Sequence, residues 1–283
     1  MAGTSMKDIK LRIRSVESTL QITKAMQLVA ASKIRRARER MENSKAYAEI
    51  ASKAAAALAA HCDTPNNVYL EKREGDKRCY AVIAGERGLA GGYNANVFKA
   101  VEAHAAGSSW CVYPFGRKAI EKYERLGKEV LSAEFPKVEG FTVGECSRVA
   151  QEWLSAYREG KFQELYLVYT GFRSMMAQEV RLVRLLPLEK EAEKNEGKAP
   201  VSTIWEPNVE EALDKIMPDY LTGRLYSALC DSYVSEVAAR RSAMDSASKN
   251  ADAMIGDLTL KFNRARQGAI TQEITEIVAG AEE

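Results

Sequence analysis

The sequence predicts an α/β protein in which two long helices, one near each end, pair as an antiparallel coiled coil beside a middle domain with a mostly parallel sheet. Residues 7–61 contain no Pro and no Gly, apolar residues recur with helical spacing near both ends, and strand-like runs alternate with helical stretches between them. With 46% hydrophobic residues among 283, wholesale disorder is excluded. We therefore divide the chain into an N-terminal helix (1–65), a middle domain (66–207) and a C-terminal helix (208–283).

The first helical segment carries a heptad seam. Apolar or small residues recur at alternating spacings of four and three, which places them on one stripe of a helix. Such a helix extends about 75–80 Å, too far for a domain of this size to wrap around it. Ala and Ser dominate the second half of the seam, so a partner helix can approach closely there. The seam positions are Ile9, Ile13, Val16, Leu20, Thr23, Gln27, Ala30, Ile34, Ala37, Met41, Ser44, Ala48, Ala51, Ala55 and Leu58.

The C-terminal segment shows the same kind of pattern. Asn208 is the expected N-cap of a helix, and Pro218 is expected to interrupt that helix. The helical pattern then continues to about Val278, and we expect the stretch after Tyr220 to pack on Ile9–Leu58. The seam positions of this segment include Ala251, Ile255, Leu258, Phe262, Ala265, Ala269, Ile270, Ile274 and Ile277.

The middle segment alternates strand and helix patterns, which indicates βαβ units and an open, doubly wound sheet with helices on both faces. The polar tract 189–198 has no core-forming residue, so we expect it to be an exposed loop. The expected strands are 79–84, 110–113, 165–169 and 180–186, and the expected helices lie near 95–105, 117–125 and 143–158.

A glycine-rich turn, Gly85–Asn94, follows the first expected strand and opens a helix, where a dinucleotide-binding fold holds a phosphate. Its spacing matches neither G-x-G-x-x-G nor G-x-x-x-x-G-K-S/T, and no Lys follows the last glycine. A turn that needs glycine for its geometry is therefore favoured, and we expect no nucleotide to bind. Arg87 is still a candidate to contact an anion or a partner.

The sequence pattern offers no basis for an active site, a metal centre or a membrane span. The two histidines, His61 and His104, have no neighbouring carboxylate or nucleophile arrangement. The five cysteines are scattered without a C-x-x-C spacing, so we expect buried or free thiols. No run of about 18 uncharged apolar residues predicts a transmembrane helix. We predict no catalytic residue, no cofactor, no metal and no direct membrane insertion.

Charge is distributed unevenly along the chain. The whole sequence has a net charge of +2, which disfavours a nucleic-acid binder, but residues 1–60 carry twelve Lys and Arg against five Asp and Glu, a net +7. The densest run, 33–40, includes Arg35, Arg36 and Arg38. Three interpretations apply to this run: a solvated helix face, a nucleic-acid contact, or an acidic protein surface against which the helix moves.

Three stretches carry a resemblance to a known family. Residues 9–37 resemble the N-terminal helix of the gamma subunit of F-type ATP synthases, residues 258–280 look like its C-terminal helix, and residues 87–94 are similar to its strand-to-helix turn. The matches follow the family order and cover both ends and the middle. The cysteine-bearing insertion of the chloroplast form is absent, so thiol regulation is not expected. Departures from the family pattern occur at Gly85, Glu86, Ala90, Arg241 and the acidic end 280–283.

The resemblance implies a central-stalk rotor subunit. Family members place an antiparallel coiled coil inside a ring of three alpha and three beta subunits, and a Rossmann-like middle domain joins the epsilon subunit and the membrane c-ring. Rotation couples ion flow, of protons or sodium, to ATP synthesis or, in reverse, to hydrolysis. The chemistry belongs to the beta subunits, so this chain is expected to be non-catalytic. It is expected at the cytoplasmic face of the bacterial plasma membrane, as a peripheral part of the complex.

The resemblance also implies contact residues by position. Met26 matches the family residue near a lever loop of the beta subunit, and Trp205 with Glu206 matches the segment that meets the c-ring. The residues matching those that contact the catch region of the beta subunit are Arg266, Gln267, Thr271 and Glu273.

Two alternatives from other classes stay open at the level of sequence. A dinucleotide-dependent enzyme would use the middle sheet, and a tightly bound nicotinamide or flavin would favour it. A basic coiled-coil adaptor for nucleic acid would show salt-sensitive DNA binding by the isolated chain.

Overall fold

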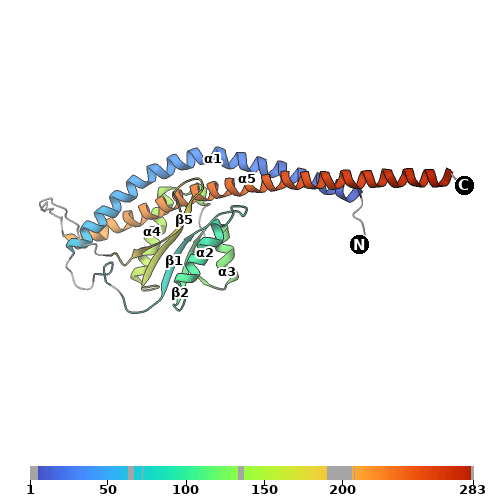
Figure 1. Ribbon diagram of the computed structural model, residues 1–283. Helices are drawn as coiled ribbons and strands as arrows, with labels where there is room; N and C mark the ends of the chain where they lie inside the picture. The colour runs from blue at the N-terminus through green and yellow to red at the C-terminus, as the bar shows by residue number, and fades with distance from the viewer. Residues whose placement is uncertain are drawn as a thin grey trace. The chain divides into compact units, whose positions relative to one another are not determined.

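A computed structural model describes residues 6–62, 67–71, 73–132, 137–189, 206 and 208–281. Figure 1 labels most of its helices and strands along the chain. The chain divides into two compact units, which we call unit 1 (Met1–Ser32 with Arg240–Glu283) and unit 2 (Lys33–Ala239). Each unit contains a piece of both long helices.

The helix α1 (Met6–His61) is uninterrupted, as predicted. Every predicted seam position on it is buried or half-buried, whereas Leu28 and Arg35 on other faces are exposed, so the heptad seam is confirmed. In unit 2, a Cβ placed on Gly223 would lie 3.1 Å from Ala48 Cα. Small seam residues therefore do allow close helix approach there.

The helix α5 (Val209–Ala281) begins where the sequence predicts, because Asn208 Oδ1 accepts a hydrogen bond of 2.8 Å from the Glu211 backbone N–H. The predicted interruption at Pro218 is wrong, since the helix continues through it. An interior proline costs about 3 kcal/mol through its missing N–H and its ring clash. Burial of the neighbouring Met217 and Leu221 in the core of unit 2 offsets that cost.

In unit 1, α1 and α5 pair antiparallel, as predicted. Thr23 Oγ1 lies 2.7 Å from Ser248 Oγ, and the Gln27 amide donates to Asp245 Oδ1 at 3.0 Å. The partner number on α5 falls as the number on α1 rises, which defines the direction.

The predicted seam of α5 extends too far. Ala251 and Leu258 are buried, but Ile270, Ile274 and Ile277 are 47%, 56% and 71% exposed. The periodic pattern continues in the sequence although no described residue of the chain covers these three side chains. At the other end of the pairing, the Tyr47 hydroxyl donates to Asp219 Oδ1 at 3.4 Å, so the pairing of α1 with α5 begins before the predicted Tyr220.

Unit 2 contains a five-stranded sheet in the order β3-β2-β1-β4-β5. Neighbouring strands are parallel except β4 and β5, which are antiparallel, so the mostly parallel sheet is confirmed. The two-residue strand β3 was not predicted. The strands are β1 (Arg78–Ile83), β2 (Trp110–Phe115), β3 (Glu129–Val130), β4 (Glu164–Phe172) and β5 (Gln178–Leu186).

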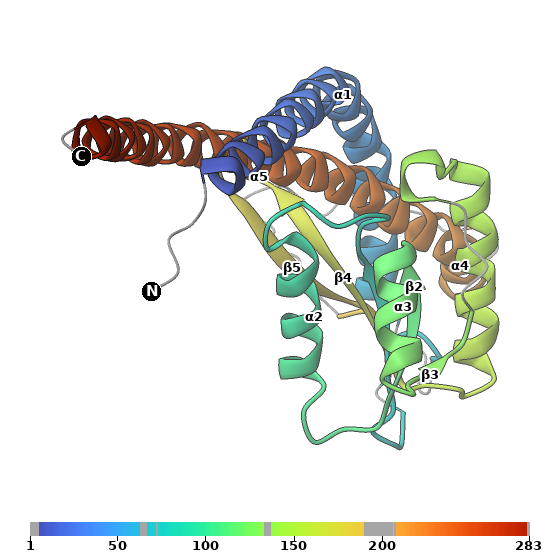
Figure 2. The same cartoon turned by 90° about the vertical axis from the view of Figure 1, so that its right-hand side faces the viewer.

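Helices cover both faces of the sheet, which confirms the doubly wound arrangement (Figure 2). One face packs Tyr80 and Val82 against α2 and α3, and the other packs Ala81 and Ile83 against α4 and the pieces of α1 and α5 that belong to unit 2. The predicted bounds of α3 and α4 are confirmed. The helices are α2 (Tyr93–His104), α3 (Arg117–Arg125) and α4 (Val143–Arg158), with a single 3-10 turn η1 (Val138–Gly140) before α4.

The predicted loop 189–198 lies outside the described residues except for Glu189, which is exposed. Within the described ranges, no helix combines the length and the apolar character that crossing a bilayer requires.

Candidate functional site

The order in which the chain adds strands to the sheet reverses between β1 and β4. From β1 the chain crosses to β2 on one side, and β4 then pairs on the other side. In doubly wound folds, ligands bind outside the carboxyl ends of the strands at this switch point. The glycine-rich turn Gly85–Asn94 lies here, between β1 and α2, so this is the first place to test for a nucleotide site.

The turn is held together by its own residues. The Gly85 N–H donates to Asn94 Oδ1 at 2.8 Å, and the Asn94 amide donates to the Arg87 carbonyl at 3.4 Å. Gly91 has a φ of 57°, a left-handed conformation that glycine adopts without strain. Gly91 therefore serves the geometry of the turn, as the sequence predicts. The Arg87 side chain is exposed.

Helix α5 places a polar face at the same strand ends. Ser232 Oγ lies 2.7 Å from the Tyr93 hydroxyl and accepts a 3.4 Å hydrogen bond from the Thr170 N–H. One turn away, a Cβ on Gly85 would lie 2.7 Å from Glu236 Oε1. Ser232 and Glu236 are both buried. The Glu236 carboxylate therefore lies against the turn, at the place where a phosphate would approach it in a nucleotide-binding fold.

Asp231 completes this polar face. Its Oδ1 accepts a 2.8 Å hydrogen bond from the Phe172 N–H at the end of β4, and its Oδ2 lies 3.7 Å from Arg181 on β5. Burial raises the pKa of Asp231, while the Phe172 N–H, the Lys45 charge and the Arg181 charge oppose that rise. Sequence reasoning missed these residues. The available signal was the spacing of Asp231, Ser232, Ser235 and Glu236 on one face of an otherwise apolar helical stretch.

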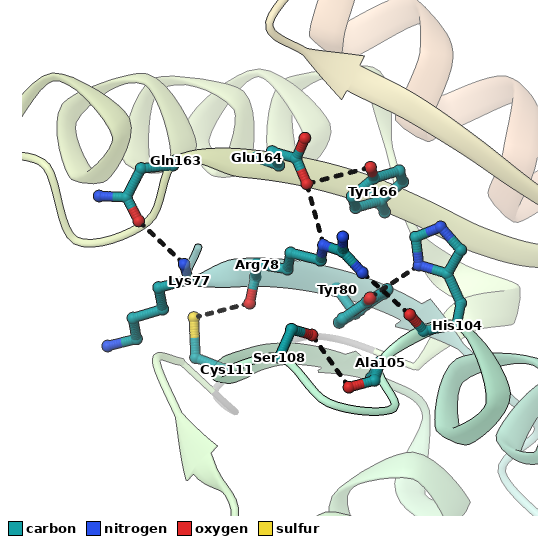
Figure 3. A network of polar contacts seen from close by, with 10 residues as sticks. All are labelled: Lys77, Arg78, Tyr80, His104, Ala105, Ser108, Cys111, Gln163, Glu164 and Tyr166. Atoms are coloured by element: carbon teal, nitrogen blue, oxygen red, sulfur yellow. Dashed lines mark hydrogen bonds and ion pairs between the residues drawn. The ribbon is translucent and has the colours of Figure 1, made fainter. Parts of the chain in front are cut away.

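A second polar network lies at the opposite, amino ends of β1 and β4 (Figure 3). Arg78 Nε and the Tyr166 hydroxyl both donate to Glu164 Oε2, at 3.0 and 3.1 Å. The Tyr80 hydroxyl lies 2.8 Å from His104 Nδ1. Burial, followed by the Arg78 charge, lowers the pKa of His104.

This network has a structural role. The Tyr80 and Tyr166 rings stack with their centroids 5.5 Å apart, and the His104 ring meets the Tyr166 ring at 4.7 Å. The side chains therefore contact one another, and burial raises the pKa of the Tyr80 hydroxyl beside the imidazole to about 12, which keeps that hydroxyl neutral. No local sequence signal predicted the network, because β1, α2 and β4 each supply part of it.

The cysteines are all buried thiols, as predicted. Cys79 and Cys111 lie opposite each other on β1 and β2. Burial raises the pKa of Cys146 to about 12, which keeps this thiol neutral and therefore a poor nucleophile. In the part of the chain that the structure describes, no group of three His, Cys, Asp or Glu side chains could hold a metal ion.

Comparison with known proteins identifies the family. A family model described as ATP synthase matches residues 5–283. The ATP synthase gamma chain of Ruminococcus albus is 44% identical over 279 residues, covering 96% of each chain. The chain belongs to the ATP synthase gamma chain family. The family resemblance inferred from the sequence is therefore confirmed, and the dinucleotide enzyme and the nucleic-acid adaptor are not favoured.

Other relatives and solved structures agree. The gamma chain of Heliobacterium modesticaldum is 39% identical and the sodium ion specific gamma chain of Acetobacterium woodii 37% identical, each covering 98% of both chains. The rotor of the Euglena gracilis mitochondrial ATP synthase has a similar fold, with a TM-score of 0.67 at 15% identity, covering 94% of this chain and 98% of that chain.

The predicted contact residues are distributed over both units. In unit 1, Met26 on α1 is half-buried, whereas the four predicted residues on α5 are exposed. In unit 2, Arg87 and Glu206 are exposed, and Trp205 lies outside the described residues. The four exposed residues on α5 are Arg266, Gln267, Thr271 and Glu273.

The basic run on α1 is exposed at Arg35, Arg36 and Arg38, as predicted, and the side chains of Arg36 and Arg38 have different neighbours. Arg38 lies 3.8 Å from Glu42, and its guanidinium carbon is 5.8 Å from the centroid of the Phe172 ring. Arg36 instead lines a groove of about 520 Å³ beside α4.

Arg40, in the same run, has a different role that sequence reasoning missed. Its guanidinium donates to the Tyr226 hydroxyl at 3.1 Å and to the backbone carbonyls of Glu139, at 2.8 Å, and Phe141. These contacts join α1, α5 and the turn before α4. The half-burial of this arginine beside the seam residue Met41 could only be found from tertiary contacts.

Proposed function

We propose that this chain is the central-stalk rotor subunit of an ATP synthase, coupling ion flow through a membrane c-ring to ATP synthesis, or in reverse to hydrolysis, on the beta subunits. The chain itself is non-catalytic. The observation that carries the proposal is the 44% identity to a named gamma chain over 96% of both chains.

The geometry suits that task. A rotor needs an element that resists twisting, and the antiparallel helix pair of unit 1 has a continuous seam that includes the buried Thr23–Ser248 contact. A rotor inside a threefold ring must also be asymmetric, so that three identical catalytic sites differ at any moment. One chain with two unlike helices meets this requirement.

We assign partners by the positions that match the family. Met26 and the exposed residues Arg266, Gln267, Thr271 and Glu273 contact beta subunits within a ring of three alpha and three beta subunits. Trp205 and Glu206 contact the c-ring, and the middle domain joins the epsilon subunit. The chain acts at the cytoplasmic face of a bacterial plasma membrane as a peripheral part of the complex, and it binds no nucleic acid.

Co-purification tests the proposal directly. The chain is expressed together with alpha and beta subunits, and the composition of the purified complex is measured by native mass spectrometry. We expect one copy of this chain with three alpha and three beta chains, and ATP hydrolysis only in the complex. A chain that stays alone, or one that hydrolyses ATP by itself, would contradict the proposal.

The basic run of α1 provides a residue-level test. Reversing Arg35, Arg36 and Arg38 to Glu should lower ATP hydrolysis by the complex, because attraction to acidic loops of the beta subunits becomes repulsion. Exposed charge pairs each contribute about 0–1 kcal/mol, so the thermal midpoint and helicity should change little. Unchanged turnover in an intact complex would show that the run is only a solvated face.

The structure suggests two controls for the triple variant. Reversal of Lys99, Arg117 and Arg125, which are exposed on α2 and α3, gives the same change in net charge on another surface and should leave turnover intact. Arg38→Glu alone should report any effect that comes from losing the Phe172 contact.

A further inference from the structure

Helix α5 buries polar side chains where an apolar face would be expected. Asp231, Ser232, Ser235 and Glu236 are buried, and they follow one another at helical spacing on a single face. Buried carboxylates are costly unless they are paired and hydrogen-bonded, and well-packed apolar residues are often at least as stable in their place. What this polar face does therefore depends on the partners that it meets.

The polar face meets the sheet at the strand ends where doubly wound folds bind ligands. Asp231 accepts from the N–H of Phe172 on β4, Ser232 contacts Tyr93 on α2, and Glu236 stands over Gly85. The end of β4, the start of α2 and the turn after β1 thus all contact α5. Here backbone N–H groups and a hydroxyl make hydrogen bonds with side chains of α5. In nucleotide-binding proteins of this architecture, a bound anion occupies the corresponding place.

We propose that this crevice is the mechanical joint between α5 and the sheet of unit 2, with Asp231, Ser232 and Glu236 as positioning residues that transmit torque. The proposal rests on the proposed rotor function. Hydrogen bonds have strict distance and angle requirements, so rotating α5 about its own axis would break several at once. Apolar contacts are non-directional and would oppose the same rotation less sharply.

Gly85 sets how closely the helix can approach. A Cβ at this position would lie 2.7 Å from Glu236 Oε1 and 3.0 Å from Glu236 Cδ, so a methyl group must displace the carboxylate. Gly88 in the same turn has open space around an added Cβ, so it provides a matched control. Ser235 provides a second control on α5, because its hydroxyl has no hydrogen-bond partner among the described residues.

The experiment measures torsional stiffness in the assembled complex. The complex with alpha and beta subunits is immobilised, and a bead is attached to α2 through Ala103→Cys, an exposed position. All native cysteines are buried, so a thiol-specific label should select the new one. The angular distribution of the bead is recorded without ATP for Gly85→Ala, Ser232→Ala and Tyr93→Phe, and for the controls Gly88→Ala and Ser235→Ala.

We expect Gly85→Ala, Ser232→Ala and Tyr93→Phe to broaden the angular distribution, while both controls keep the width of the wild type. Adding Glu236→Asp to Gly85→Ala shortens the displaced side chain by one methylene and should narrow the distribution again. If Gly85→Ala does not assemble, the two milder variants carry the test.

If Ser232→Ala and Ser235→Ala gave angular distributions of equal width, the proposal of a joint would be overturned. A general loss of stability would instead lower the thermal midpoint without separating joint variants from controls by angular width. A wild-type chain that does not assemble with alpha and beta subunits, or does not rotate on adding ATP, would contradict the rotor function itself.

Discussion

The two compact units solve the same packing problem in different ways. In unit 1, two helices bury one stripe each, and the described residues that become buried are few and mostly small. In unit 2, pieces of the same two helices pack on a sheet that also has helices on its other face. Among the described residues of unit 1, the buried ones are Ile9, Thr23, Ala30, Met244, Ser248, Ala251 and Leu258.

The difference shows that a helix can change its role along its length. In unit 1 the seam of α5 is narrow and partly polar, and its last described turns expose Ile270 and Ile277. In unit 2 α5 is buried on several sides, as at Leu225, Leu229 and Val234. Since apolar burial dominates stability, unit 2 should be the more stable part of the chain.

The largest expected effect comes from the core of unit 2. Trp153 on α4 is fully buried, so Trp153→Ala should destabilise unit 2 by about 3–5 kcal/mol. Amide hydrogen exchange should show lost protection in α4 and β1 and little change at Thr23–Ala30. Trp153→Phe is the control and should cost less, because the indole N–H has no described partner to lose. Equal loss of protection in both units would break the comparison.

A smaller effect is expected in the seam of unit 1. Ser248→Ala removes the buried hydroxyl that contacts Thr23 and should cost about 1 kcal/mol, the usual net worth of a hydrogen bond. Adding Thr23→Val should cost little more, because both partners are then apolar. Denaturant unfolding of the four variants in this cycle measures the coupling. Thr19→Val, at an exposed position of α1, is the control and should be neutral.

Strict additivity of the two substitutions would contradict a direct contact between the hydroxyls. It would show that each side chain acts through its own helix, for Thr23 through its bond to the Leu20 carbonyl at 3.0 Å.

The smallest expected effect is a pH dependence of the stability of unit 2, which arises from a histidine. His104 lies in unit 2, so the pH effect expected from it belongs to that unit. Burial, followed by the Arg78 charge, lowers the pKa of His104, so the unfolded chain binds the proton first as pH falls. Neutral His104 therefore contributes to the free energy of unfolding fully above the ordinary histidine pKa of about 6.5. That contribution is lost as the pH falls below this value.

Thermal midpoints test this expectation. Between about pH 7.5 and pH 5.5, the midpoint of the wild type should fall more than that of His104→Asn, which keeps an acceptor near Nδ1 but does not titrate. Glu164 contributes the opposing charge at this site, so Glu164→Gln should make the fall larger. Identical pH profiles for wild type and His104→Asn would show that the imidazole does not contribute.

Most elements could be predicted from the sequence, because their signals are local. The absence of Pro and Gly from 7–61 and a regular seam predicted α1, and the bounds of α3 and α4 matched their helical patterns. The strand β3 has only two residues and no pattern of its own, since it exists through pairing with β2. The direction of β5 is likewise a property of the pair, as a strand pattern does not encode orientation.

The candidate site was predictable only in part. The sequence located the glycine-rich turn and correctly gave a geometric role to its glycines Gly85 and Gly91. It could not show that Glu236, 151 positions after Gly85, stands over that turn. It also grouped Arg35, Arg36 and Arg38 by proximity along the chain, whereas Arg38 meets Phe172 and Arg36 lines a groove.

By itself, the sequence determined the two long helices, the alternating middle segment and the family, because helical period, strand runs and motif order are written along the chain. Only the tertiary structure decided that α5 passes through Pro218, that its seam stops being covered near Ile270, and that its polar face enters the crevice of the sheet. Each of these three features of α5 depends on which residues pack against it in the folded chain. The free energy of burying a side chain is set by its partner in space, and that partner is distant in sequence.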